Sequence, residues 1–279
     1  MSVTQIYCEG TSGGLDARII AEIAPRGCLV KPIGSKNRSA FKVVADRSIS
    51  PMLGMLVDRD FDCAATAVVE KPVPIFEGTV PVGWSWERKE IENYLLDPTI
   101  VEKAWVSKGI FTLDDYRQAL IQAAERLKFY TAARTALSCF SYRNRWGTNR
   151  SEFKSYKFPR DISQQACRTK IEEIVNEDKS DRIVTPANVI QKFEDLLPEF
   201  STSGHRQAHP LVYHSGKDFL LAMKPSLDSW MPSPQSSIQT FLERITKQLE
   251  REENVWDWLP EWTELRNLLE NTDFGNASI

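Results

Sequence analysis

The chain has 279 residues, a hydrophobic share of 42%, a charged share of 26% and a formal net charge of −3. These values exclude a fibrous or largely disordered protein, and they provide no overall positive field for nucleic acid. No apolar run reaches the roughly 18–20 residues that cross a bilayer, and the N-terminus lacks a signal-peptide pattern.

The cysteines are scattered and form no CxxC pair; they are Cys8, Cys28, Cys63, Cys139 and Cys167. In a chain of this size, that pattern favours free buried thiols in a reducing compartment over a disulfide framework or a zinc site. A cytoplasmic protein is therefore expected.

The first hundred residues predict strands that alternate with helices. Strands are expected at 3–8, 28–33 and 52–57, and helices at 15–24 and 37–46. The run MLGMLV at 52–57 is almost wholly apolar, which suits a strand buried on both faces of a parallel sheet. Residues 71–86 contain three prolines and predict an edge strand and loop. The alternation predicts an α/β unit with a parallel sheet.

Helical patterns dominate the rest of the chain. Helices are expected at 87–96, at 112–130 with a capping box of Thr112 and Asp115, at 185–197, and at 237–269. The first of these should end before Asp97-Pro98, because the residue before a proline disfavours helix. The sequence thus predicts an α/β domain over residues 1–105 and a mostly helical region over residues 106–279.

Carboxylates follow two of the predicted strands. LVDRDFD places Asp58, Asp60 and Asp62 at alternate positions after the buried strand, and IYCEG places Glu9 after the first strand. In open α/β sheets, ligand sites lie beyond the carboxyl ends of the strands. Clustered carboxylates repel one another unless a cation joins them, and Mg²⁺ and Mn²⁺ prefer oxygen ligands. The sequence therefore predicts a divalent metal site.

A strand ending in Glu-Gly, followed later by an apolar strand ending in D-x-D-x-D, resembles the signature of the Toprim domain. The element RKEIENYLL resembles the helix start of Toprim nucleases of the overcoming-lysogenization-defect (OLD) type, which include the effector nucleases of PARIS anti-phage systems. These motifs cover residues 3–98; beyond them the match rests on HSGKDFLLAM and the general course of the chain.

The resemblance implies a Toprim-like fold and a metal-dependent nuclease that hydrolyses phosphodiester bonds in DNA or RNA, including tRNA. It also implies an anti-phage effector under the control of an ABC-type ATPase partner. Glu9 becomes a metal ligand or general base, Asp58 and Asp60 become ligands, and Asp62 is a third. Glu92 of the IEN motif binds a second Mg²⁺ or Mn²⁺ ion or lies beside it. Two ions about 3.5–4 Å apart suffice for phosphodiester hydrolysis.

By the same resemblance, Lys217 of the SGKD motif stabilises the transition-state phosphate. This chain departs from the family at one point. Many Toprim domains have an Asp four residues after the glutamate, where Gly13 stands here, and the next acid is Asp16. Asp16 equally suits the N-cap of the following helix.

A basic, aromatic segment spans residues 128–160. It suits a nucleic-acid backbone and unstacked bases, although a helix with a solvated face and core aromatics explains the same composition. The expected nucleic-acid contacts are Arg143, Arg145, Arg150, Lys154 and Lys157.

The histidines and the C-terminal tryptophans also fall into groups. His205, His209 and His214 lie without an HExxH motif or a cysteine pair, so a solvated or substrate-facing loop is expected rather than a zinc site. The tryptophans suit the core as well as a surface that docks a partner or a second copy in a homodimer; they are Trp256, Trp258 and Trp262.

Two alternatives to the nuclease stay open on the sequence. A phosphatase of the haloacid dehalogenase class also follows an apolar strand with D-x-D. That class needs Thr or Val soon after the second Asp, whereas Cys63 follows Asp62, and Glu9 would be unexplained. The other alternative is a non-catalytic protein that keeps the Toprim fold and binds a metal or a partner.

Overall fold

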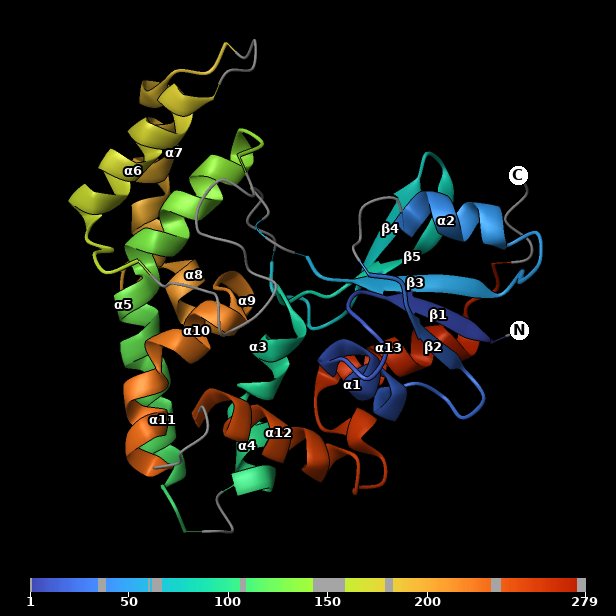
Figure 1. The fold of residues 1–279 in the computed structure, drawn as a ribbon. Helices are drawn as coiled ribbons and strands as arrows, with labels where there is room; N and C mark the ends of the chain where they lie inside the picture. The colour runs from blue at the N-terminus through green and yellow to red at the C-terminus, as the bar shows by residue number, and fades with distance from the viewer. Residues whose placement is uncertain are drawn as a thin grey trace.

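The computed structural model describes residues 2–34, 39–59, 61, 67–105, 109–142, 159–178, 183–231 and 237–274. In these ranges a five-stranded sheet has the order β2-β1-β3-β5-β4. The strands are β1 (Gln5–Cys8), β2 (Leu29–Pro32), β3 (Leu53–Val57), β4 (Val73–Glu77) and β5 (Val80–Ser85). All neighbours run parallel except β4, which is antiparallel to β5. The predicted α/β sheet unit followed by a helical region is confirmed (Figure 1).

The central strand β3 explains why the sheet forms where the sequence predicts it. All five of its residues are buried. Since side chains alternate across a strand, Leu53, Met55 and Val57 pack with Val43 on one face, while Leu56 joins the core on the other face. A strand covered on both faces needs a continuous apolar run, and MLGMLV is such a run.

The interpretation of residues 71–86 as an edge strand and loop is wrong in its second half. β4 is an edge strand, but β5 lies between β3 and β4. Pro81 is tolerated because β3 pairs with β5 only from Gly83 onward, so its missing N–H costs no bond to β3. Gly83 is required there, because a Cβ at this position would lie 2.1 Å from the carbonyl oxygen of Met55.

Helices cover both faces of the sheet. α2 (Ser39–Asp46) lies on one face, and α1 (Leu15–Ile23) and α13 (Pro260–Asn271) lie on the other (Figure 1). Val3 N donates to Leu269 O at 2.8 Å, and the rings of Trp84 and Phe274 lie 5.6 Å apart. The C-terminal residues therefore return to the sheet and help to form its core.

The other helices lie beside the sheet, with the long α5 on the far side of the molecule (Figure 1). The α-helices are α3 (Ile91–Leu95), α4 (Pro98–Trp105), α5 (Leu113–Cys139), α6 (Gln164–Glu177), α7 (Pro186–Leu196), α8 (His205–Ala208), α9 (Pro210–Tyr213), α10 (Gly216–Ala222), α11 (Lys224–Trp230) and α12 (Ser237–Leu249). Two 3-10 helices are η2 (Leu197–Phe200) and η3 (Val255–Asp257). None of the helices described is long and apolar enough to cross a membrane.

The helices expected at 15–24 and 185–197 agree closely with α1 and α7, and the helix expected at 112–130 starts as predicted but continues to Cys139. The predicted capping box is present, with Thr112 N donating to Asp115 and Asp115 N donating to Thr112, each at 3.1 Å. The helix expected at 87–96 begins only at Ile91, because Glu90 is extended with φ −156°. The helix expected at 237–269 is two helices, with Asn254 in the left-handed region (φ +57°) between them.

The expectation of free thiols holds for Cys8, Cys28 and Cys167 and is wrong for Cys139, which is disulfide-bonded. Cys63 lies outside the described residues. The end of α5 lies beside the segment after β3, since Ser138 there donates a hydrogen bond to the carbonyl oxygen of Phe61. The spacing of cysteines along the sequence does not show that the end of α5 and the segment after β3 lie close together.

The C-terminal tryptophans separate into two groups. Trp262 is fully buried, 6.1 Å from the ring of Tyr94, so it is a core residue. Trp256 and Trp258 are half-buried and are covered in part by cationic side chains. Docking of a partner at these two residues stays a prediction.

Candidate active site

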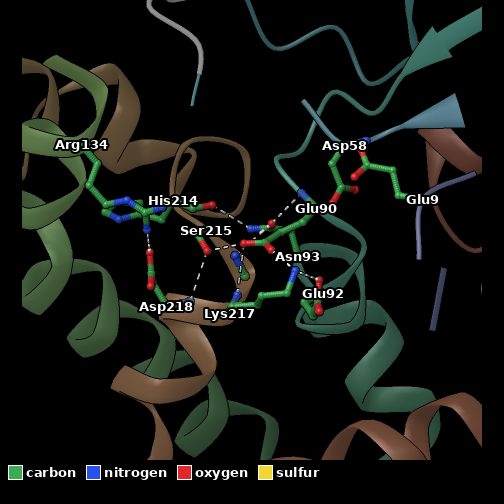
Figure 2. Close-up of polar contacts among 11 residues, drawn as sticks. Glu9, Asp58, Glu90, Glu92, Asn93, Arg134, His214, Ser215, Lys217 and Asp218 are labelled. Carbon is green, nitrogen blue, oxygen red and sulfur yellow. Dashed lines mark hydrogen bonds and ion pairs between the residues drawn. The ribbon is translucent and has the colours of Figure 1, made fainter. Parts of the chain in front are cut away.

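Glu9 and Asp58 lie side by side at the carboxyl ends of two neighbouring parallel strands, β1 and β3. The backbone N–H of Asp58 donates to Glu9 Oε1 at 3.1 Å, which fixes the glutamate beside the aspartate (Figure 2). The pairing follows from the fold, because residues that end adjacent parallel strands reach the same edge of the sheet. Asp60 and Asp62, the other two acids predicted here, lie outside the described residues.

Asp16 belongs to the same group of carboxylates. The N-cap of α1 is Gly14, so the alternative of Asp16 as the cap is wrong, and Asp16 stands in the first turn instead. A Cβ built on Gly10, next to Glu9, would lie 3.6 Å from Asp16 Oδ2, so the carboxylate faces the turn after β1. Burial raises the pKa of Asp16, and Glu90 raises it further, against the lowering effect of Lys217.

Two segments far apart in the sequence meet at the start of α3. Asn93 Oδ1 accepts from its own cap residue, Glu90 N, at 3.2 Å and from Gly216 N at 3.1 Å, and Asn93 Nδ2 donates to His214 O at 3.0 Å. A Cβ on Gly216 would lie 2.6 Å from Asn93 N. Only glycine permits this approach, so the RKEIEN and HSGKD segments are fitted to each other.

Lys217 lies between two carboxylates of the IEN segment. Its ammonium pairs with Glu90 and lies 3.2 Å from Glu92 Oε2, and its side chain is 36% exposed (Figure 2). Burial lowers the pKa of Lys217, but Glu90, Glu92 and Asp58 outweigh it and hold the pKa well above its usual value. The lysine is therefore a fixed positive charge in an acidic group.

Glu90 holds that lysine in place. Its carboxylate also accepts a hydrogen bond from the Ser215 hydroxyl and one from Lys217 N at 3.4 Å. Burial raises the pKa of Glu90, but the Lys217 ammonium and these hydrogen bonds outweigh it, so the pKa is lowered. Glu90 is thus ionised and engaged, which distinguishes it from its neighbour Glu92.

Asp58 and Glu92 are destabilised as anions. Burial, then the charge of Asp16, raises the pKa of Asp58 well above its usual value, with Glu90 and Glu9 adding to it. Burial also raises the pKa of Glu92 to about 7, with Glu90 and Asp16 opposing the stabilising effect of Lys217. We name the group of Glu9, Asp16, Asp58, Glu90, Glu92 and Lys217 the carboxylate cluster.

The cluster has the chemistry of a Mg²⁺ or Mn²⁺ site. Its donors are all carboxylate oxygens, and their mutual repulsion is relieved when a divalent cation joins them. Within the ranges that the structure describes, no three His, Cys, Asp or Glu side chains converge on one point as they stand. Of the predicted metal ligands, Glu9, Asp58 and Glu92 belong to the cluster, as does Lys217, which was predicted to stabilise the phosphate.

Behind the cluster lies a buried polar network. Arg134 pairs with Asp218 (Figure 2), and both side chains are 2% exposed. The Arg134 guanidinium carbon lies 3.8 Å from the centre of the Phe61 ring. Thr131 Oγ1 lies 2.8 Å from His214 Nδ1. Arg134 is thus a core residue, although it belongs to the basic segment at 128–160.

The prediction of a solvated or substrate-facing loop is wrong for His214, which is fully buried between Phe200 and Phe219. Burial lowers its pKa to about 3, with Lys89 and Arg206 adding to the effect. His205 and His209 are exposed, with ring centroids 5.0 Å apart. The expected nucleic-acid contacts Arg143, Arg145, Arg150, Lys154 and Lys157 lie outside the described residues.

Two residues of the cluster escaped sequence reasoning. The sequence signal for Glu90 is its position two residues before Glu92, which places two acids at the start of one helix. Asp16 was interpreted equally as the N-cap of the helix that follows it. Ser215, which supports Glu90, is the N-cap of α10 and precedes Gly216 in the motif.

No protein-family model matches the chain, and no curated protein matches it.

Proposed function

We propose that this protein is a Mg²⁺- or Mn²⁺-dependent nuclease of the Toprim, OLD-like type, which hydrolyses phosphodiester bonds in nucleic acid. The observation that carries the proposal is the meeting of Glu9, Asp58, Glu92 and Lys217. Glu9 and Asp58 follow β1 and β3, and Glu92 and Lys217 lie on α3 and α10. Asp58 N donates to Glu9, and the charges of Asp58 and Glu92 both act on Lys217. Perturbed pKa values from burial and like charges are typical of functional sites.

In this proposal Glu9 and Asp58 hold the cation, with Asp60, Asp62 and Glu92 as further ligands. When bound, a pair of such ions supplies a hydroxide nucleophile at neutral pH and neutralises charge on the phosphate. Asp16 adds negative charge that raises cation affinity.

The protein's own groups position the reaction. The N–H of Asp58 orients the Glu9 carboxylate, and Glu90 with Ser215 fixes the Lys217 ammonium. Lys217 offers positive charge to a phosphate, and such charge counts most where protein replaces water. Because Lys217 is partly exposed, a substrate reaches it without unfolding of the surrounding helices.

The ABC-type ATPase partner and the anti-phage role belong to the same proposal. Their support is the resemblance to effector nucleases of PARIS systems in the Glu-Gly, D-x-D-x-D and IEN motifs. A neighbouring reading frame that encodes such an ATPase would add to this support. Which nucleic acid is cleaved follows from the experiment below.

The test is incubation of the purified protein with Mn²⁺ or Mg²⁺ and with plasmid, single-stranded DNA or total tRNA, followed by gel analysis. Glu9→Gln and Asp58→Asn should each lower the cleavage rate by on the order of 10²–10³, the scale for removal of a group that stabilises transition-state charge. Glu102→Gln, an exposed carboxylate on α4, is the matched control and should cleave normally.

Circular dichroism of each variant shows whether loss of cleavage reflects loss of the fold. Cleavage retained in both Glu9→Gln and Asp58→Asn would refute the proposal, as would the absence of cleavage by the native protein with any of these substrates. Hydrolysis of p-nitrophenyl phosphate with no cleavage of nucleic acid would instead favour a phosphatase.

A further inference from the structure

A cleft of about 770 Å³ opens beside the carboxylate cluster. Glu92 of the cluster lines it, together with Leu15 and Arg18 of α1 and several residues of α12. Figure 1 shows α12 below α1 and next to α4, and α12 packs against both of these helices. Glu92 belongs to both, so the cleft and the cluster are adjacent.

The cleft walls carry more positive than negative charge. The cationic residues that line it are Arg18, Arg244, Lys247 and Arg251, and the acidic ones are Glu92 and Glu243. This local excess contrasts with the net charge of −3 for the whole chain. A polyanion repelled by most of the surface would therefore be attracted here.

The cationic residues of the cleft differ in whether acidic side chains of the protein already pair with them. Arg18 donates to Glu250 at 2.7 Å and to Glu243 at 3.0 Å, which ties α1 to α12. By contrast, Arg244 and Arg251 form no ion pair with the residues that the structure describes. These two guanidinium groups are available to an external anion.

Arg244 is also held in a defined place. Its guanidinium carbon lies 4.1 Å from the centre of the Trp105 ring. Stacking covers a flat face of the guanidinium and leaves its N–H edges as donors, the arrangement in which arginine binds phosphate through two hydrogen bonds. Arg244, Lys247 and Arg251 recur at spacings of three and four residues, so they line one side of α12 and its end.

We propose that this cleft binds the sugar-phosphate backbone of the nucleic-acid strand next to the phosphate that is cleaved. The inference rests on the proposed nuclease function. From Arg244 to Leu249, the last residue of α12, the helix rises about 7.5 Å, and stacked nucleotides rise about 3.4 Å each, so the cationic row spans at least about two nucleotides. The presence of Glu92 in the cleft wall suits a polymer that lies in the cleft and reaches the cluster.

The experiment compares the double variant Arg244→Gln/Arg251→Gln with a control that loses two cations elsewhere, Arg117→Gln/Lys170→Gln on α5 and α6. Fluorescence anisotropy measures the binding of a labelled single-stranded oligonucleotide in EDTA over a range of salt concentrations. The cleft variant should bind about tenfold or more weakly, and the slope of log affinity against log salt should fall by roughly 1–2, as for two lost phosphate contacts. The control should bind like the native protein.

Arg251→Gln alone is the second variant, because Arg251 is exposed beyond the end of α12 and its removal leaves the Trp105 contact intact. Cleavage of an oligonucleotide should fall further in the cleft variants than hydrolysis of bis(p-nitrophenyl) phosphate, a diester too short to occupy the cleft. Native-like binding by both cleft variants, an equal loss in the control, or competition by polyglutamate as strong as by unlabelled oligonucleotide would each overturn the inference.

The two proposals fail in different ways. If the native protein hydrolyses no diester, the nuclease proposal fails, while the anisotropy still decides whether the cleft binds nucleic acid. If the native protein cleaves nucleic acid and the cleft variants bind it normally, only the cleft inference fails.

Discussion

Lys217 and Asp218 are neighbours on α10, and each lies in an ion pair, but the two pairs differ in charge balance. Asp218 faces Arg134 in the core, one anion against one cation, both 2% exposed. Lys217 faces Glu90 and Glu92, with Asp58 and Asp16 also close enough to affect the ionisation of the group. Among the ion pairs that the structure describes, one anion meets one cation on the first side of the helix, whereas two anions meet one cation on the second.

The difference separates a structural from a functional use of charge. A buried pair that is matched in number keeps helices α5 and α10 together and leaves no charge for a ligand. A cluster in which carboxylates outnumber cations is unstable by itself and becomes stable when it binds a cation. The comparison therefore predicts opposite effects on stability when a carboxylate is neutralised on the two sides of α10.

Asp218→Asn should give the largest effect. It removes the charge that pairs with the buried Arg134 guanidinium, so the free energy of unfolding should fall by about 3–5 kcal/mol. Urea denaturation followed by circular dichroism measures this loss.

The control is Glu173→Gln, which breaks an exposed pair with Lys170 at 2.8 Å and should cost no more than about 1 kcal/mol. If Asp218→Asn cost as little as this surface change, the pair would not be a structural element of the core. Replacement of both Arg134 and Asp218 by apolar residues should recover much of the stability, because no charge is then left buried.

The parts of the fold that depend on local sequence were predictable. The strands at β1 and β3 were expected because their apolar runs are short and end at acids, and the positions of Glu9 and Asp58 followed from those strand ends. The start of α5 was expected because Thr112 and Asp115 satisfy each other's backbone N–H groups. In each case the determining contacts lie within a few residues.

The parts that depend on contacts between distant segments were not predictable. The role of Glu90 follows from Ser215 and Lys217, which approach it only because Gly216 packs on Asn93. Arg134 belongs to the basic, aromatic segment at 128–160, yet Asp218 and an aromatic ring keep it in the core. Residue type alone does not distinguish these environments.

Glu92→Gln should change stability in the opposite direction. The folded-state pKa of Glu92 is raised from 4.5 to about 7 by burial and by Glu90 and Asp16. Its contribution to stability is therefore fully present below pH 4.5 and is lost as the pH rises through 7. Without metal at pH 8, Glu92→Gln should raise the free energy of unfolding by about 1–3 kcal/mol, with Glu102→Gln as the unaffected control.

Denaturation in EDTA at several pH values checks this result, and the gain should shrink toward zero at pH 4.5. Adding Mn²⁺ should stabilise the native protein more than the variant, because the cation relieves the repulsion that the substitution has already removed. A variant less stable than the native protein at pH 8 would mean that Glu92 serves as a structural partner of Lys217.

At neutral pH His214→Gln should change stability least, and its effect should appear mainly in the pH dependence of unfolding. The folded-state pKa of His214 is lowered from 6.5 to about 3, chiefly by burial. Its contribution to stability is present above pH 6.5 and is lost as the pH falls toward 3, with a slope of at most about 1.4 kcal/mol per pH unit. The variant should unfold with a shallower dependence on pH in this range, and His209→Gln, on the surface, should behave like the native protein.

The two sides of α10 should thus respond to acid in opposite ways. Protonation of Glu92 relieves the cluster, whereas protonation of His214 places a charge beside Lys89 and Arg206 in the core. Combining Glu92→Gln with His214→Gln tests this directly, since each substitution removes one of the two opposing pH dependences of the free energy of unfolding. An unchanged pH profile in His214→Gln would show that other groups of the core control acid unfolding, and the contrast would then rest on the carboxylates alone.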